Sequence, residues 1–470
     1  MIWSIVQVIG KQGLTVIIFA ILAFLLNPVD FGILGMAMAW IAFIQVFSEL
    51  GFGAALVQRQ EINSNYFSTI FFINVAFGIS LTFIGILLSW PCALFFKTQE
   101  VQPIMVVLSL GFVINSFSLT YIAIAQRELR FRDLAIRDIS ASLIGGIVGI
   151  IFAFLKFGVW SLVVQSLINY AVGTILLWNM SKWKPRLKEF SFQYVKNLWD
   201  YSSKIFGFQI FKYFAQNTDK LIIGYLLGPI SLGLYTFAYK LTVSPVITIV
   251  GSIGNYLFPQ FSKIQEDLET IKSSYLFINK VINCIVAPCM VIIALLSPSI
   301  VPLIFGQKWI STIPLIQILA ILGIIIPWIS PAGQVMKALN HPGWLLNWSV
   351  LITILISLFI WVGSTLNVTG ATIGLVIAHI LALPIIFWML SKLLHYSLKD
   401  ILDLFASSFL SSLFMALLLW SILRNGEILG HFKIYIGLLF AITFYLIIMV
   451  FIDKPFLKVL FRKIMALRSI

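Results

Sequence analysis

The chain has 470 residues, of which 60% are hydrophobic and only 10% are charged, and its mean hydropathy is +1.04. Soluble domains carry about 25% charged residues, so this composition excludes a soluble globular protein and indicates an integral membrane protein. The net charge of +14 does not indicate nucleic-acid binding, because basic and aromatic residues are not interleaved on one soluble face.

Apolar runs of about 20 residues, the length that crosses about 30 Å of hydrocarbon, follow one another along the chain. Only α-helical spans fit runs of this length, since barrel strands are about half as long and alternate in polarity. We expect fourteen spans, centred at Val16, Met38, Val75, Phe112, Gly146, Val164, Phe214, Val246, Val286, Leu319, Leu355, Ile380, Phe414 and Ile442.

Most of the 31 Lys and Arg residues fall in loops on one side of this arrangement, in three clusters. The clusters cover residues 127–137, 182–196 and 454–468. Basic loops stay on the cytosolic side of membranes, so we expect both termini in the cytosol. Neither Cys nor His residues occur at spacings typical of a disulfide framework or a metal site.

A 13-residue pattern occurs twice, 201 residues apart. LLNPVDFGILGMA at 25–37 and LLGPISLGLYTFA at 226–238 each lie where one apolar run ends and the next begins. The pattern predicts a helix, a tight Pro/Gly corner and a returning helix, used once in each of two similar lobes.

The longest polar interruption, at 181–201, follows six predicted spans. Because six is even, both copies of the pattern enter the membrane in the same direction. We therefore expect two six-helix lobes related by a pseudo-two-fold axis along the membrane normal. The predicted parts are an N-lobe at 1–180, a cytosolic linker at 181–201, a C-lobe at 202–396, and two extra C-terminal spans with a basic cytosolic tail at 397–470.

Several segments resemble one family in their order and spacing. They are the two copies of the corner, SELGFGAALVQRQ at 48–60, QRELRFRDLAIRDISASLIGG at 126–146, FGVWSLVVQSL at 157–167 and NTDKLIIGYLLGPISLGLYTFAYKL at 217–241. Together they resemble the Wzx-type polysaccharide flippases of the multidrug, oligosaccharidyl-lipid and polysaccharide (MOP) exporter superfamily, in its lipopolysaccharide and teichuronic acid branch. The chain departs from many relatives at Phe24 and Tyr225, where they have an Arg before the corner, so no basic contact can be assumed there.

The resemblance implies a MATE-like fold in the bacterial cytoplasmic (inner) membrane and no cofactor other than H⁺ or Na⁺ as a coupling ion. It also implies a flippase that moves a polyprenyl-diphosphate-linked oligosaccharide to the outer leaflet by alternating access. The expected partners are that glycan, membrane lipids and other polysaccharide assembly proteins. The alternatives are a MATE-type drug or cation antiporter, a lipid II flippase and, as an enzyme, a membrane polysaccharide polymerase. We do not expect an enzyme, because the predicted outward loops are short and poor in acidic residues.

Charged side chains inside spans cost about 2.5 to 3.5 kcal/mol on insertion scales and so mark functional sites. A single stripe of the seventh span carries several polar side chains at helical spacing, namely Gln209, Lys212, Gln216, Asp219 and Lys220. Lys11 in the first span precedes Lys212 by the same 201 residues. Tyr239 and Lys240 lie at similar depth in the eighth span.

We interpret Lys11, Lys212 and Lys240 as cations that attract the diphosphate, while Gln, Tyr and Asn side chains hydrogen-bond sugar hydroxyls. The alternative is a helix-packing bridge from Asp219 to Lys212 or Lys220. For Asp219 we favour a counter-ion over a coupling site for H⁺ or Na⁺.

Three further residues lie near the predicted cytosolic surface. Glu49 either lines the cytosolic entrance or is a solvated carboxylate at a helix end. Arg127 and Arg130 could receive the diphosphate at this surface, although we favour a plain topology signal for both.

Overall fold

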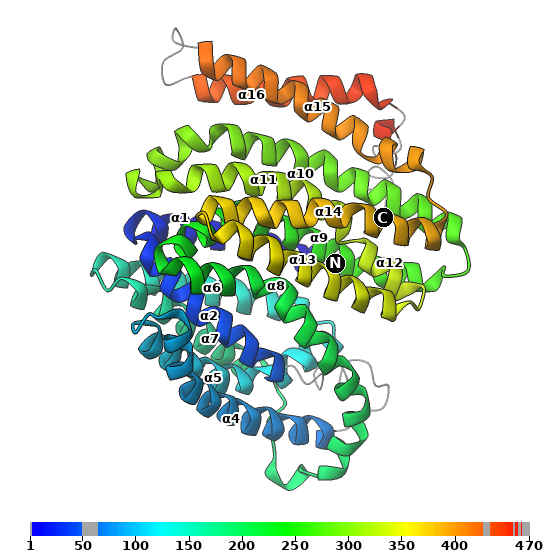
Figure 1. The fold of residues 1–470 in the computed structure, drawn as a ribbon. Coiled ribbons are helices and arrows are strands. Elements are labelled where there is room, and N and C mark those ends of the chain that lie inside the picture. The colour runs from blue at the N-terminus through cyan, green and yellow to red at the C-terminus, as the bar shows by residue number, and fades with distance from the viewer. Residues whose placement is uncertain (1, 49–63, 426–432, 455, 459–461, 463–470) are drawn as a thin grey trace. The chain divides into compact units, whose positions relative to one another are not determined.

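The computed structural model describes residues 2–48, 64–425, 433–454, 456–458 and 462 (Figure 1). Its elements are α1 (Ile2–Leu25), α2 (Pro28–Ser48), α4 (Ser64–Phe96), α5 (Val101–Arg127), α6 (Phe131–Phe154), α7 (Val159–Met180), η1 (Leu187–Glu189), α8 (Phe192–Leu241), α9 (Val243–Lys263), α10 (Leu268–Phe305), η2 (Gln307–Thr312), α11 (Ile313–Ile329), α12 (Ala332–Ala338), α13 (Pro342–Ser364), α14 (Val368–Leu394), α15 (Leu398–Asn425) and α16 (Lys433–Ile452). No strand occurs in these ranges, which confirms the predicted all-helical fold class.

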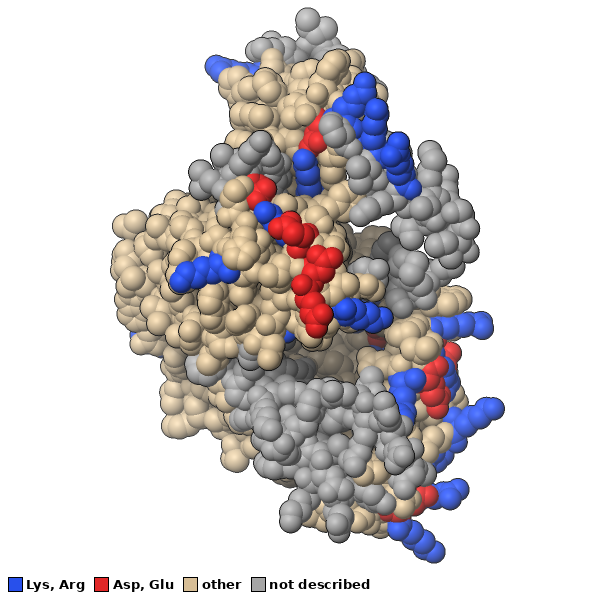
Figure 2. Space-filling view, turned by 90° about the vertical axis from the view of Figure 1, so that its right-hand side faces the viewer, with Lys and Arg blue, Asp and Glu red and all other residues tan. Residues whose placement is uncertain are grey.

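The fourteen predicted span centres fall in fourteen different helices of this set. Eleven helices among the described residues are long and apolar enough to cross a membrane, and the apolar parts of α1 and α16 are shorter. Many large apolar side chains are exposed, for example Leu87 (74%) and Phe451 (84%). Water would disfavour such a surface, whereas lipid tails match it. On the face shown in Figure 2, charged side chains gather in patches and much of the remaining visible surface carries no charge.

The helices form two compact units, which are described separately. Unit 1 comprises Met1–Phe237, Ile304–Lys308 and Ile356–Ala371. Within it, α4 packs on α5, α6 on α7, α1 on α6, and α2 against α4, α5 and α7. Aromatic residues of α4, α5 and α7, among them Phe71, Tyr121 and Trp178, join these helices edge to face.

Unit 2 comprises Ala238–Leu303, Trp309–Leu355 and Thr372–Ile470. In this unit α9 packs on α11 and α12, and α15 packs along α16. A buried cluster that includes Val246, Val286 and Met290 joins α9, α10 and α11. The Tyr445 hydroxyl on α16 donates a 2.8 Å hydrogen bond to the Cys284 carbonyl on α10. This bond fixes the last helix to the unit.

The two copies of the repeated corner lie in unit 1, except for Ala238 at the end of the second, and pack against each other. A Cβ placed on Gly32 would lie 1.8 Å from the Pro229 carbonyl oxygen, and one on Gly233 would lie 1.8 Å from the Pro28 carbonyl oxygen. Only glycine allows backbones to approach this closely. The reciprocal contact is the kind that an approximate two-fold relation between the two copies produces.

The second copy forms a kink between two helical segments of α8. Gly228 has φ 76° and ψ −175°, a conformation that favours glycine because a Cβ would be strained there. Pro229 follows and lacks the N–H that a continuing helix would need. The chain therefore turns at Gly228 between two helical segments, as the repeated pattern predicts.

Candidate functional site

A cluster of charged side chains lies inside unit 1, between α1 and α6. Asp138 on α6 accepts a 2.9 Å hydrogen bond from the Gln7 side chain, and its Oδ2 lies 3.5 Å from the Lys11 Nζ. Its Oδ1 accepts a 3.0 Å hydrogen bond from Arg137 Nη1. Lys11 lies about 14 Å along α1 from its first residue, and Asp138 about 10 Å along α6. Two cations therefore share one carboxylate well inside two apolar helices.

The exposure of these side chains differs in a way that fits a binding role for Lys11. The Asp138 side chain is 11% exposed and that of Arg137 is 17% exposed, whereas that of Lys11 is 50% exposed. Asp138 and Arg137 thus form the buried base, and the ammonium group of Lys11 is the accessible part. The cluster carries a net charge of +1, which attracts an anion in surroundings of low dielectric constant.

The Arg137 guanidinium passes over Gly173 on α7. A Cβ on Gly173 would lie 2.9 Å from Arg137 Nε, so glycine makes room for the arginine. Arg137 Nε is buried and has no hydrogen-bond partner. Sequence analysis missed this cluster because it assigned Arg137 to a cytosolic basic loop and did not place Asp138 inside a span. The adjacent Arg-Asp pair, seven residues into an apolar helix, was the signal that could have revealed it.

The predicted stripe of α8 surrounds a buried carboxylate. Asp219 is 6% exposed, and its Oδ2 accepts a 2.6 Å hydrogen bond from the Tyr235 hydroxyl. Its Oδ1 is buried without a hydrogen-bond partner. Lys220 donates a 3.1 Å hydrogen bond to the Asn217 side-chain oxygen, and Gln216 is exposed.

Five more predicted site residues divide into three with side chains outside the described structure and two at the end of α8. The side chains of Gln209 and Lys212 lie outside the described part of the structure, as does Glu49 altogether. Tyr239 and Lys240 belong to unit 2, where they lie in the last turn of α8. Lys240 is exposed and Tyr239 is half-buried.

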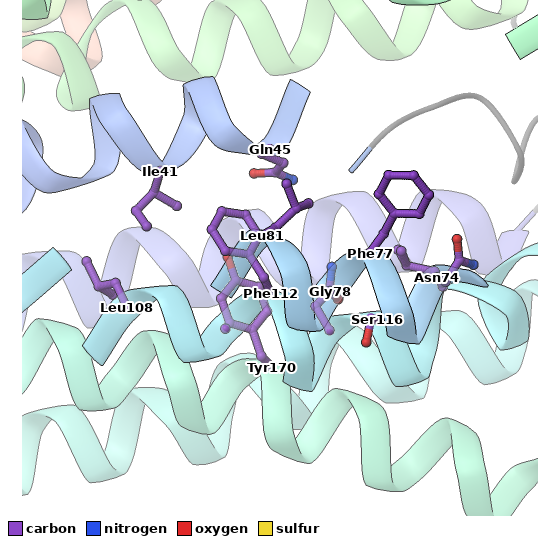
Figure 3. Close-up of a pocket in the computed structure, with 13 residues that line it drawn as sticks. Ile41, Gln45, Asn74, Phe77, Gly78, Leu81, Leu108, Phe112, Ser116 and Tyr170 are labelled. Carbon is purple, nitrogen blue, oxygen red and sulfur yellow. The ribbon is translucent and has the colours of Figure 1, made fainter. Parts of the chain in front are cut away.

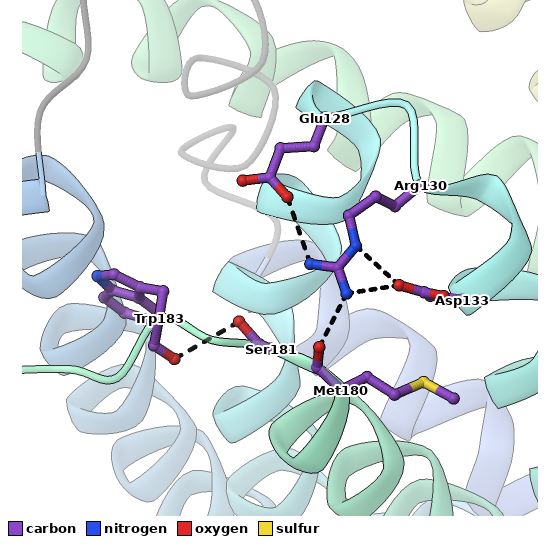
Figure 4. Close-up of polar contacts among 6 residues, drawn as sticks. All are labelled: Glu128, Arg130, Asp133, Met180, Ser181 and Trp183. Atoms are coloured by element: carbon purple, nitrogen blue, oxygen red, sulfur yellow. Dashed lines mark hydrogen bonds and ion pairs between the residues drawn. The ribbon is translucent and has the colours of Figure 1, made fainter.

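The arginine predicted at the cytosolic entrance has protein partners on every side (Figure 4). Arg130 Nε donates a 2.7 Å hydrogen bond to Asp133, Nη1 lies 3.3 Å from Glu128, and Nη2 donates a 2.8 Å bond to the Met180 carbonyl. These bonds tie the turn between α5 and α6 to the end of α7. Arg127, at the end of α5, is half-buried.

A cavity opens between four helices of unit 1 (Figure 3). Its lining comes from α2, α4, α5 and α7, and the roughly 580 Å³ of space beside these residues includes space open to the surroundings. Gln45, Asn74, Asn115, Ser116 and Tyr170 contribute polar groups, and none of the lining residues is charged. Sequence analysis did not identify this cavity, because its polar residues are isolated in the sequence and converge only in the folded unit.

Comparison with known proteins agrees with this architecture. The family described as "Polysaccharide biosynthesis protein" matches residues 21–314. The chain belongs to this family. It is 26% identical over 393 residues to the lipopolysaccharide biosynthesis protein WzxC of Escherichia coli, covering 83% of this chain and 80% of the relative. It is 24% identical over 446 residues to the teichuronic acid biosynthesis protein TuaB of Bacillus subtilis, covering 94% and 91%.

Solved structures show which fold the family member adopts. The lipid II flippase MurJ in an inward closed conformation matches with a TM-score of 0.74 at 14% identity, over 97% of this chain and 99% of that chain. An inward-facing MATE-family multidrug transporter of the MOP superfamily matches with a TM-score of 0.66 at 17% identity, over 84% and 99%. The predicted MATE-like membrane fold is confirmed, and the chain is a multi-span membrane protein.

Proposed function

We propose that this protein flips a polyprenyl-diphosphate-linked oligosaccharide from the cytosolic to the outer leaflet of the bacterial cytoplasmic membrane. Its family is named for polysaccharide biosynthesis. One relative of Haloferax volcanii is named a probable low-salt glycan biosynthesis flippase, and one of Rhizobium meliloti a succinoglycan biosynthesis transport protein. None of these names describes a catalysed reaction, which supports a transporter over an enzyme.

The observation that carries the proposal is the cluster of Lys11, Arg137 and Asp138 inside the helices of unit 1. A diphosphate without a counter-charge cannot cross hydrocarbon, because the desolvation of an isolated anion costs tens of kcal/mol in idealised estimates. The exposed ammonium group of Lys11, which lies beside the buried Asp138–Arg137 ion pair, offers such a counter-charge. Lysine suits transient binding, since its ammonium is a compact charge on a flexible stem.

The other proposed site residues lie on α8. Lys212 and Lys240 are the further cations, and Gln209, Gln216, Lys220 and Tyr239 are the further polar groups. Asp219 balances the lysines of its stripe; the alternative, a coupling site for H⁺ or Na⁺, predicts that an Asp219→Asn variant loses the dependence of transport on an ion gradient. The lobes at 1–180 and 202–396 then alternate their access to the two sides, with both termini in the cytosol.

The experiment is surface-glycan export in cells that depend on this chain. Lys11→Ala, Lys212→Ala and Lys240→Ala should each abolish export at normal protein level, and Lys→Arg at each position should partly restore it. The matched control is Lys182→Ala, because Lys182 is exposed in the loop after α7. Normal export in the triple Ala variant would overturn the assignment of these cations.

A further inference from the structure

The cavity of unit 1 gathers polar groups from four separate helices. Gln45 comes from α2, Asn74 from α4, Asn115 from α5 and Tyr170 from α7 (Figure 3). All four helices are otherwise strongly apolar. A polar side chain inside a span is costly and typically marks a binding site or transport path. Convergence from four separate helices on one cavity makes a chance arrangement a poor explanation.

The bonds already made by these groups leave capacity for a ligand. Asn74 donates from Nδ2 to Thr120 Oγ1 at 3.3 Å, and Asn115 Oδ1 accepts from Ser118 at 3.1 Å. An amide offers two donors and an acceptor oxygen with two lone pairs. Each side chain therefore retains hydrogen-bonding capacity after its one bond within the protein.

Aromatic rings form another part of the lining. A Cβ on Gly111 would lie 3.1 Å from the Tyr170 ring, so the glycine lets that ring lie close against α5. Phe77 and Phe112 add two further rings. Aromatic surface beside amide groups suits a ligand with one apolar face and several hydroxyl groups.

We propose that this cavity binds an uncharged sugar residue of the lipid-linked glycan. Amides pair with hydroxyls as both donors and acceptors, and the rings pack against the C–H face of a pyranose. The uncharged lining disfavours the diphosphate, which would need cations. The inference rests on the proposed function and adds a second binding site. The cationic residues bind the carrier diphosphate, and the cavity binds the glycan.

The test measures binding of three lipids to the purified full-length chain in lipid nanodiscs. The probes are a polyprenyl diphosphate, the same lipid bearing one glucose and the same lipid bearing one N-acetylglucosamine. The wild-type chain should bind at least one glycosylated lipid about tenfold more tightly than the bare diphosphate, since several net-favourable hydrogen bonds are added. Asn115→Leu and Gln45→Ala should each reduce that preference about threefold to tenfold without changing affinity for the bare lipid.

Controls separate this inference from the proposed function. Ser80→Ala should keep the preference, because Ser80 is an exposed residue of α4 whose hydroxyl bonds the Ala76 carbonyl. Lys11→Ala should weaken binding of all three lipids alike. Tyr170→Phe keeps the ring and tests the hydroxyl alone, should Asn115→Leu fail to fold. Equal wild-type binding of the three lipids, or an undiminished preference in all folded cavity variants, would overturn the sugar site. Absence of binding to any of the lipids would overturn the proposed function as well.

Discussion

The two copies of the repeated corner have nearly the same sequence pattern and make the same backbone contact, yet they are stabilised differently. In the first copy a helix ends at Leu25 and a new one begins at Pro28, with Asp30 Oδ2 accepting a 2.8 Å hydrogen bond from the Asn27 N–H. In the second copy Gly228 takes a positive φ, and the chain kinks there between two helical segments. One corner thus depends on a side-chain cap and the other on a glycine conformation.

A lysine also reaches each corner from a distant loop of unit 1. Lys308 donates a 2.6 Å hydrogen bond to the Phe24 carbonyl, and Lys97 lies 5.4 Å from the centre of the Tyr225 ring. Neither Phe24 nor Tyr225 is basic, but the fold brings a lysine to each corner. The shared sequence pattern therefore determines the glycine–proline backbone contact between the copies, while the interactions that stabilise each turn differ.

The largest expected effect comes from adding a methyl group at the shared contact. Gly32→Ala and Gly233→Ala would each place a Cβ 1.8 Å from a carbonyl oxygen of the other copy, and backbone cannot move aside as a side chain does. We expect each to destabilise the protein by about 3 kcal/mol or more, measured as the loss of melting temperature in detergent.

Gly35→Ala is the matched control for this prediction. Its Cβ would meet Leu232 and Thr236 side chains at 3.4 Å, an ordinary contact distance. Its melting temperature should therefore stay near that of the wild type. Equal stability of Gly32→Ala and Gly35→Ala would break the account of the corner contact.

The next effect tests the difference between the two copies. Gly228→Ala should cost about 1 to 3 kcal/mol, because a φ of 76° with a ψ of −175° is a backbone conformation that is strained for any residue with a Cβ. No atom lies near enough to add a clash. The equivalent change Asn27→Ala should cost less, since Asn27 is not among the described residues with positive φ. A greater loss of melting temperature in Asn27→Ala would reverse the comparison.

Loss of the Asp30 side-chain cap in the first copy should cost a similar or smaller amount of stability. Asp30→Ala removes the acceptor for the Asn27 N–H and should cost about 0.5 to 2 kcal/mol. Ser231 occupies the equivalent position and makes no such bond among the described residues, so Ser231→Ala should have little effect. Thermal unfolding of the two variants side by side measures the difference, and equal losses would contradict it.

The smallest effects concern the lysines that reach the corners. Lys97→Ala removes an exposed cation–π contact worth about 0.5 to 1 kcal/mol. Lys97→Gln has a similar length without the charge and should behave alike. Lys308→Ala leaves the Phe24 carbonyl, in an exposed setting, to be solvated by water or lipid headgroups. Unfolding in detergent at low and high salt measures how much of the stability lost in each variant depends on charge. A stability loss above about 2 kcal/mol in Lys97→Ala or Lys308→Ala would contradict this ranking.

The limits of sequence analysis are clearest at the charged cluster of α1 and α6. Lys11 stood out because an isolated lysine in an apolar run needs an explanation. Its partner Asp138 lies 127 positions later, next to basic residues that suggested a cytosolic loop. The same holds for the cavity, because Gln45 and Asn115 lie on helices whose mutual packing no local pattern encodes.

The sequence by itself determined the helical membrane fold, the number and order of the long helices, and the duplicated corner. These properties follow from hydropathy and from the local conformations that Pro and Gly allow or forbid, and both act over a few turns of the chain. Only the tertiary structure decided that Gly32 and Gly233 meet the opposite proline, that Asp138 joins Lys11 to Arg137, and that polar side chains from four helices share one cavity. Each of these depends on which helix faces which, and that is fixed by packing between segments far apart in the sequence.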